Sequence, residues 1–98
     1  MMEETGIKDS VIDEIRDLAK KCGVGKVILF GSRARGDYKR ASDIDLAAGG
    51  GDVFRFALAV DEETSTPLRF DIVNLDEKIC EELQDAIRTE GRILYEKI

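Results

Sequence analysis

Two carboxylates separated by a single residue are the first feature of this sequence that could perform chemistry. Asp43 and Asp45 lie in residues 43–48, where the alternation of residue types predicts a strand. Side chains two positions apart in a strand project from the same face, so both carboxylates would lie side by side. Their repulsion would be relieved by a divalent cation. Mg²⁺ prefers such hard oxygen ligands and often shares its shell with phosphates, so the pair predicts a magnesium site; the alternative is a solvated strand end.

A glycine and a serine directly follow the apolar segment of residues 26–30. Gly31 would let a phosphate approach the backbone, and amides at the start of a short helix would point toward the anion. Arg33 and Arg35 add charged donors suited to phosphate oxygens, although either could face solvent or pair with an acid instead. We therefore predict a nucleotide-binding turn made of Gly31, Ser32, Arg33 and Arg35.

These groups need a scaffold, which the spacing of apolar residues predicts. A first helix is expected from Ser10, interpreted as its capping residue, to Gly23. Asp52 is expected to cap a second helix that ends before Pro67, and a third covers residues 76–90. Strands are predicted over residues 26–30, 43–48 and 68–73, with residues 93–95 as a short closing segment.

This order of elements predicts an α+β fold. We expect a small mixed sheet of three or four strands, with helices packed mainly on one face. The length of 98 residues allows one core, so residues 1–98 are expected to form a single domain.

Composition narrows the possible chemistry. Histidine is absent, so carboxylates must perform any acid-base or metal chemistry. The formal net charge of −6 lacks the basic excess with which proteins displace counterions from nucleic acids. We therefore do not expect duplex DNA as a partner.

Cysteines and hydropathy bear on the cellular compartment. Cys22 and Cys80 lack the spacing of metal or redox sites, so reduced, partly buried thiols are expected rather than a disulfide. No apolar segment approaches the roughly 20 residues of a membrane span, and the first residues do not resemble a signal peptide. We expect a cytoplasmic protein without a membrane partner.

The motif formed by these residues resembles that of a known family. Gly31-Ser32, ten residues, and Asp43-x-Asp45 match the Gly-Ser-x10-Asp-x-Asp signature of the DNA polymerase β-like nucleotidyltransferase superfamily. The runs at residues 31–36 and 42–46 look most like the minimal nucleotidyltransferases, which are often encoded beside a HEPN-domain protein as toxin-antitoxin pairs. The motif covers only residues 31–45, but the predicted order of elements extends the resemblance, and with it an expected nucleotidyltransferase-like fold, over nearly the whole chain.

The resemblance implies a third catalytic carboxylate, which falls on Asp71. This residue follows Asp45 by 26 positions and lies in an apolar strand, where a buried acid would need a partner. The alternative is that Asp71 only pairs with Arg69 or another base. The family role would make Asp43, Asp45 and Asp71 both the catalytic and the metal-binding residues.

By the same resemblance, the expected activity is Mg²⁺-dependent transfer of a nucleoside monophosphate, AMP from ATP or its counterpart from another nucleoside triphosphate. Two metal ions about 4 Å apart would assist when nucleotide is bound. The leading acceptor is a tyrosine hydroxyl on a helical HEPN-type partner, which would be silenced, so the chain would act as an antitoxin in a homo- or hetero-oligomer.

Alternatives to an enzyme remain at this stage. The chain could be a non-catalytic nucleotide-binding antitoxin that neutralises its partner by contact, or a nucleotide sensor. Tyr38 could stack on a base, although an exposed loop tyrosine is favoured. Lys39 and Arg40 are interpreted as a solvated turn rather than a phosphate clamp.

Overall fold

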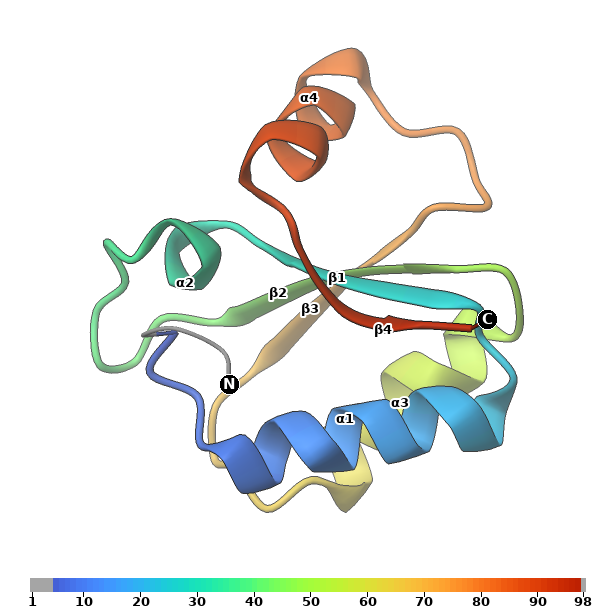
Figure 1. Cartoon of the computed structure of the whole chain (residues 1–98), viewed down its shortest axis with the longest axis horizontal. Coiled ribbons are helices and arrows are strands. Elements are labelled where there is room, and N and C mark those ends of the chain that lie inside the picture. The colour runs from blue at the N-terminus through green and yellow to red at the C-terminus, as the bar shows by residue number, and fades with distance from the viewer. Residues whose placement is uncertain (1–4, 98) are drawn as a thin grey trace.

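A four-stranded mixed sheet forms the centre of the molecule (Figure 1). The computed structural model describes residues 5–97. The sheet order is β3-β2-β1-β4; β1 is antiparallel to both β2 and β4, while β2 and β3 are parallel. The strands are β1 (Lys26–Phe30), β2 (Ile44–Gly49), β3 (Phe70–Asn74) and β4 (Arg92–Glu96). The predicted closing segment is thus a full strand, which gives four strands.

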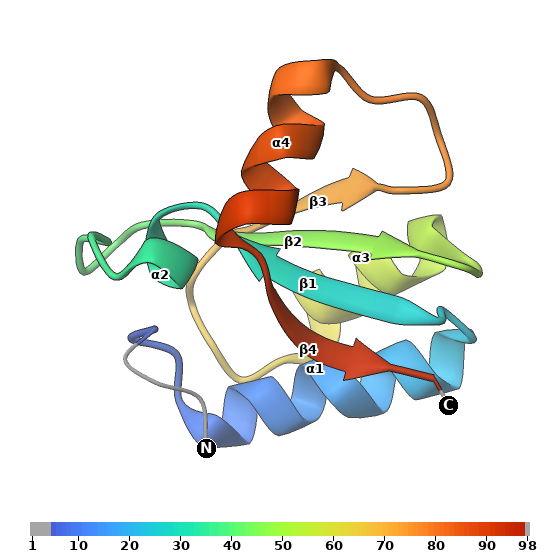
Figure 2. The same cartoon turned by 45° about the horizontal axis from the view of Figure 1, so that its top comes forward.

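Helices cover the two faces of this sheet unequally. The helices are α1 (Asp9–Cys22), α2 (Ser32–Arg35), α3 (Val53–Glu63) and α4 (Glu81–Glu90). Figures 1 and 2 show α1 and α3 together on one face, α4 alone on the other, and the short α2 beyond the end of β1. The predicted α+β class, with helices mainly on one face, is confirmed.

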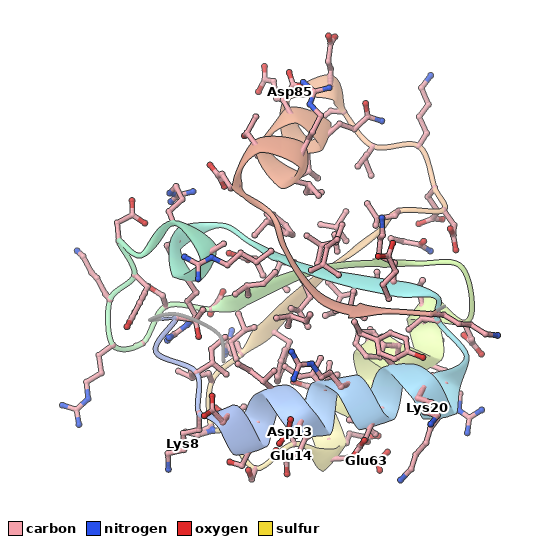
Figure 3. All side chains as sticks on the ribbon, viewed as in Figure 1. Lys8, Asp13, Glu14, Lys20, Glu63 and Asp85 are labelled. Carbon is pink, nitrogen blue, oxygen red and sulfur yellow. The ribbon has the colours of Figure 1, made fainter. Side chains whose placement is uncertain are left out.

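The larger core lies between the sheet and the pair α1 and α3. Apolar residues of α1 recur three or four positions apart, so the helix buries one continuous stripe. From the sheet, Leu29, Ile44 and Leu46 are fully buried in this cluster, and Phe56 of α3 fills its other side. The charged side chains labelled in Figure 3 lie instead on the outer surface of the α1 and α3 layer and at the far end of α4.

A smaller core lies under α4, on the opposite face of the sheet. Its buried members are Phe30, Ala47 and Ile87, and Ile28 and Val73 pack against them. Because strand side chains alternate between faces, the odd positions of β2 and β3 point toward α4. This alternation decides on which face the predicted acids lie.

Several element ends differ from the predictions. The first helix begins at Asp9 with Lys8 at its N-cap, so Ser10 is not the capping residue. The third strand begins at Phe70 rather than residue 68. The last long helix begins at Glu81 rather than residue 76, because Asp76 accepts the Gly50 amide at 2.9 Å and stays in a turn.

The predicted cap of the second helix is confirmed. The Asp52 carboxylate caps α3 by accepting the Arg55 amide at 3.0 Å. Both cysteines are free thiols; Cys22 is buried, but Cys80 is exposed, contrary to the expectation that both are partly buried. Over residues 5–97, no helix has the length and apolar character needed to cross a membrane.

Candidate functional site

The sheet register brings the three predicted acids to one place. Asp45 of β2 pairs directly with Asp71 of β3, and Phe30 at the end of β1 pairs with Asp45 from the other side. Asp45 and Asp71 occupy the alternate positions of Ala47 and Val73, so they lie on the face that carries α4. Asp43 precedes β2 by one residue and is exposed. The neighbouring strands β2 and β3 therefore carry three carboxylates at one end of the sheet.

Asp45 is the half-buried acid of the three, whereas Asp43 and Asp71 are exposed. Burial raises the pKa of its carboxyl, and the nearby charges of Asp71 and then Asp43 raise it further, while Arg35 partly opposes the shift. Asp71, Asp43 and Arg35 therefore all lie within electrostatic reach of the Asp45 carboxyl. Together, burial and these charges disfavour the ionised form of Asp45.

The expectation that Asp71 is buried was wrong. The apolar run around it suggested burial, but its side chain is exposed because β3 is an edge strand. Among residues 5–97, none of the ion pairs joins Asp71 to Arg69. No ion pair within these residues joins Asp71 to another base either, so the alternative in which Asp71 pairs with Arg69 or another base has no support there.

Gly31 occupies a backbone position that suits glycine alone. Its φ is +78°, in the left-handed region that other residues rarely adopt. A Cβ built on Gly31 would collide with the carboxylate oxygen Oδ2 of Asp45. The missing side chain therefore makes room for Asp45 itself, a requirement that the sequence motif does not reveal.

We predict that Gly31→Ala destroys the site more than it destroys the fold. With φ +78° and ψ −160°, Gly31 adopts a conformation essentially restricted to glycine, so the strain should cost about 1–3 kcal/mol. The new methyl group must also displace the Asp45 carboxylate. Mg²⁺-dependent ATP affinity measured by calorimetry should fall about 10- to 100-fold, the usual loss when the support of a metal ligand is removed. Gly36→Ala is the matched control, since Gly36 has φ +95° at the other end of α2 but nothing within 4 Å of its Cβ position. Equal affinity in the two variants would contradict the contact with Asp45.

The turn after Gly31 leaves two amides available. The amides of Ala34 and Arg35 donate to the Gly31 carbonyl at 3.1 and 3.0 Å, which starts the short helix α2. Helix geometry leaves the amides of Ser32 and Arg33 without an intrahelical acceptor. Ser32 is half-buried. Backbone donors and a hydroxyl group thus directly follow the glycine that lies against Asp45.

The two arginines of the turn have different surroundings. Arg35 is exposed and donates to Asp37 at 3.2 Å and to Glu90 of α4 at 3.1 Å. Hydrogen bonds to Asp37 and then Glu90 raise the pKa of Arg35. Arg33 is 1% exposed, and its guanidinium donates to backbone carbonyls. Arg35 is the arginine of the turn that solvent and ligands can reach.

Some supporting residues were missed or misread. Glu90 lies 55 positions from Arg35, so no local pattern could have connected them. Tyr38 is neither free to stack on a base nor an exposed loop residue: it is half-buried, and its ring lies 4.9 Å from the Arg33 guanidinium. Lys39 and Arg40 are exposed, as expected of a solvated turn.

The chemistry of this cluster fits a divalent cation that is completed by a ligand. Among residues 5–97, no group of three or more Asp, Glu, Cys or His side chains forms a metal cage by itself. The three acids are nevertheless hard oxygen donors whose charges repel at Asp45. Such an open set suits a cation that takes part of its shell from phosphate oxygens.

Comparisons with known proteins agree with this geometry. A family model described as polymerase beta, nucleotidyltransferase, matches residues 13–98. The chain is 37% identical over 81 residues to a Methanocaldococcus jannaschii protein named "Putative protein adenylyltransferase MJ0604", covering 74% of this chain and 79% of that protein.

Solved structures share the fold. A toxin-antitoxin crystal structure with AMP-PNP has a TM-score of 0.71 and 23% identity, over 88% of this chain and 73% of that chain. A mutant of the toxin-antitoxin MntA-HpeT has a TM-score of 0.70 and 21% identity, over the same shares of 88% and 73%. Because the family model spans nearly the whole chain, this protein belongs to the polymerase beta nucleotidyltransferase family.

Proposed function

We propose that this nucleotidyltransferase moves AMP from ATP to a hydroxyl group of a protein, a tyrosine of a HEPN-type partner, and thereby acts as an antitoxin. The observation that carries the proposal is the direct pairing of Asp45 with Asp71 beside the Gly31 turn. The name of the Methanocaldococcus relative supports a protein acceptor. The similar toxin-antitoxin structure with AMP-PNP supports an adenine nucleotide and a partner protein.

In this proposal the chain positions the reacting groups. The amides of Ser32 and Arg33 and the exposed guanidinium of Arg35 bind the triphosphate. Asp43 and Asp45, with Asp71, would hold Mg²⁺, which supplies charge stabilisation to the phosphates when bound. Asp71, exposed at the edge of the sheet, accepts the proton of the incoming hydroxyl. The hydroxyl oxygen bonds to the α-phosphorus as the bond to pyrophosphate breaks, so AMP moves to the acceptor.

The pairing of Arg35 with Glu90 gives this site a further test. A triphosphate that binds Arg35 must compete with Glu90 and Asp37 for its donors. Glu90→Gln should therefore leave ATP binding unchanged or strengthen it severalfold, whereas Arg35→Gln should weaken it about tenfold or more. Titration calorimetry with Mg²⁺ and ATP measures both. Equal affinity of Arg35→Gln and wild type would remove Arg35 from the proposed site.

The direct test of the activity uses the neighbouring gene product. We expect the purified chain, incubated with ATP, Mg²⁺ and the protein encoded beside it, to add AMP to a tyrosine of that partner. Intact-mass and peptide mass spectrometry detect the added AMP and its position. An unmodified partner that the chain still neutralises would instead support a contact antitoxin, and modification of another residue type would correct the acceptor.

A further inference from the structure

Within residues 5–97, Arg33 is a buried cation without an anionic partner. Its side chain is 1% exposed, and over residues 5–97 no carboxylate forms an ion pair with it. Its Nε and Nη2 donate to the Ser42 carbonyl at 3.0 and 2.9 Å. Nη2 also donates to the Arg40 carbonyl at 3.3 Å, and Nη1 donates to the Thr5 carbonyl at 2.9 Å. One guanidinium thus joins α2 to the loop of residues 36–43 and to the N-terminal segment.

The surroundings of Arg33 are shaped to hold it. The ring of Tyr38 lies 4.9 Å from its guanidinium carbon. Gly6 has φ +69°, and a Cβ there would lie 2.6 Å from Nη1 of Arg33 and 2.7 Å from Cζ of Tyr38. Glycine at position 6 therefore lets the N-terminal segment close over the guanidinium and the ring. Figure 1 shows this segment beside the loop that follows α2.

Burying the Arg33 guanidinium costs free energy. The contacts that offset this cost therefore indicate what the side chain does. A buried cation without a counter-charge is tolerated only when its donors are satisfied. Here backbone carbonyls and the face of an aromatic ring satisfy them. The planar fork of arginine spreads its donors over three nitrogens, which here reach carbonyls of two separate segments. A lysine ammonium carries its three donors on one nitrogen and cannot reproduce that spread.

We infer that Arg33 is a positioning residue: it fixes the peptide that joins Ser42 to Asp43, and so holds the Asp43 carboxylate in register with Asp45. Two of its donors converge on the Ser42 carbonyl, and the planarity of the peptide bond transmits that restraint to the Asp43 backbone. The prediction that Arg33 contacts the nucleotide through its guanidinium is thereby replaced. That Asp43 matters for metal and nucleotide binding rests on the proposed function. The restraint of Arg33 on the loop of residues 36–43 does not rest on it.

Hydrogen exchange tests the restraint without any nucleotide. The Ser42 amide donates to the Lys39 carbonyl at 3.0 Å, and the Lys39 amide donates to the Ser42 hydroxyl at 2.8 Å, so both amides report on the loop. In Arg33→Lys we expect both to exchange about tenfold faster or more, while core amides such as that of Leu46 keep their rates. Unchanged protection of the loop amides in the folded variant would overturn the inference.

A second variant disturbs the arrangement while keeping the arginine. Gly6→Ala must displace Arg33 or Tyr38, so the loop amides should again lose protection. Gly23→Ala is the matched control, because Gly23 has φ +75° but nothing within 4 Å of its Cβ position. Equal loop protection in these two variants would also overturn the inference.

The last measurement separates positioning from a merely structural role. Partial unfolding would lower the active fraction but not the Mg²⁺ concentration that gives half-maximal ATP binding. Misplacement of Asp43 should raise that concentration about tenfold in Arg33→Lys. Added guanidinium ion should restore it in Arg33→Ala. An unchanged Mg²⁺ requirement would overturn the positioning role, and a wild-type chain that binds ATP without transferring AMP would contradict only the proposed function.

Discussion

Asp71→Asn is expected to lower the rate of AMP transfer at least about 100-fold, in the range of losses seen when a general base is removed. Asparagine is nearly the same size but cannot accept the proton of the hydroxyl group and is a weaker metal ligand than a carboxylate. Because Asp71 lies exposed at the edge of the sheet, the substitution should leave the core and the Gly31 turn intact. ATP binding should therefore fall much less than kcat.

The measurement uses radiolabelled ATP, Mg²⁺ and the partner protein, with calorimetry for ATP affinity. Asp13→Asn is the control, since Asp13 is an exposed acid of α1 on the opposite side of the sheet. Its transfer rate should equal that of wild type. If Asp71→Asn transferred AMP normally, Asp71 would not be the base. If it neutralised the partner as completely as wild type without any transfer, inhibition would depend on contact.

The spacing of apolar residues is enough to place most of the fold. Helix α1 is recognised by apolar residues three or four positions apart, which it buries as one stripe. Strand β1 is recognised as a short β-branched and aromatic run bounded by glycines. Element ends are less visible in the sequence. The delayed start of α4 depends on a contact between Asp76 and Gly50, two residues 26 positions apart.

Some features of the site could likewise be predicted from local residue spacing, whereas others depend on residues that are distant in the sequence. The same-face placement of Asp43 and Asp45 was predicted from the strand period, but β2 begins at Ile44, so Asp43 lies just outside the strand on which that prediction rested. The pairing of Asp45 with Asp71 depends on strand order, which spacing does not determine. The prediction that Asp71 is buried was wrong for that reason, because the sequence of an apolar strand does not show whether the strand is central or at the edge of the sheet. Only the family resemblance brought Asp71 into the site.

Arg33 and Arg35 show that residue type alone does not predict which side chain can reach a nucleotide. Arg33 and Arg35 lie two positions apart on one short helix, so their side chains leave it about 200° apart. One therefore faces the buried loop carbonyls and the other faces solvent and Glu90. Both were assigned to the nucleotide by charge alone. Their separation into a positioning and a ligand-accessible residue depends on the rotation of α2, which the structure supplies.

The double substitution Asp43→Asn with Asp45→Asn should change binding and stability in opposite directions. Metal-dependent ATP binding should fall at least about 100-fold, because two charged oxygen ligands are lost from a site that also needs Asp71. Without metal, the chain should be as stable as wild type or more so. Burial and the charges of Asp71 and Asp43 both disfavour the ionised form of Asp45, and a neutral amide of the same size removes that repulsion.

Calorimetry with Mg²⁺ and ATP measures the first effect, and thermal unfolding in a chelator measures the second. The control is Asp13→Asn with Asp61→Asn, which removes the same charge from exposed positions of α1 and α3. This control should bind ATP as wild type does, and any gain in its stability measures the effect of net charge alone. A double variant at Asp43 and Asp45 that kept metal-dependent binding would remove these acids from the site. A marked loss of stability without metal would mean that their carboxylates are held by favourable contacts, contrary to the repulsion at Asp45.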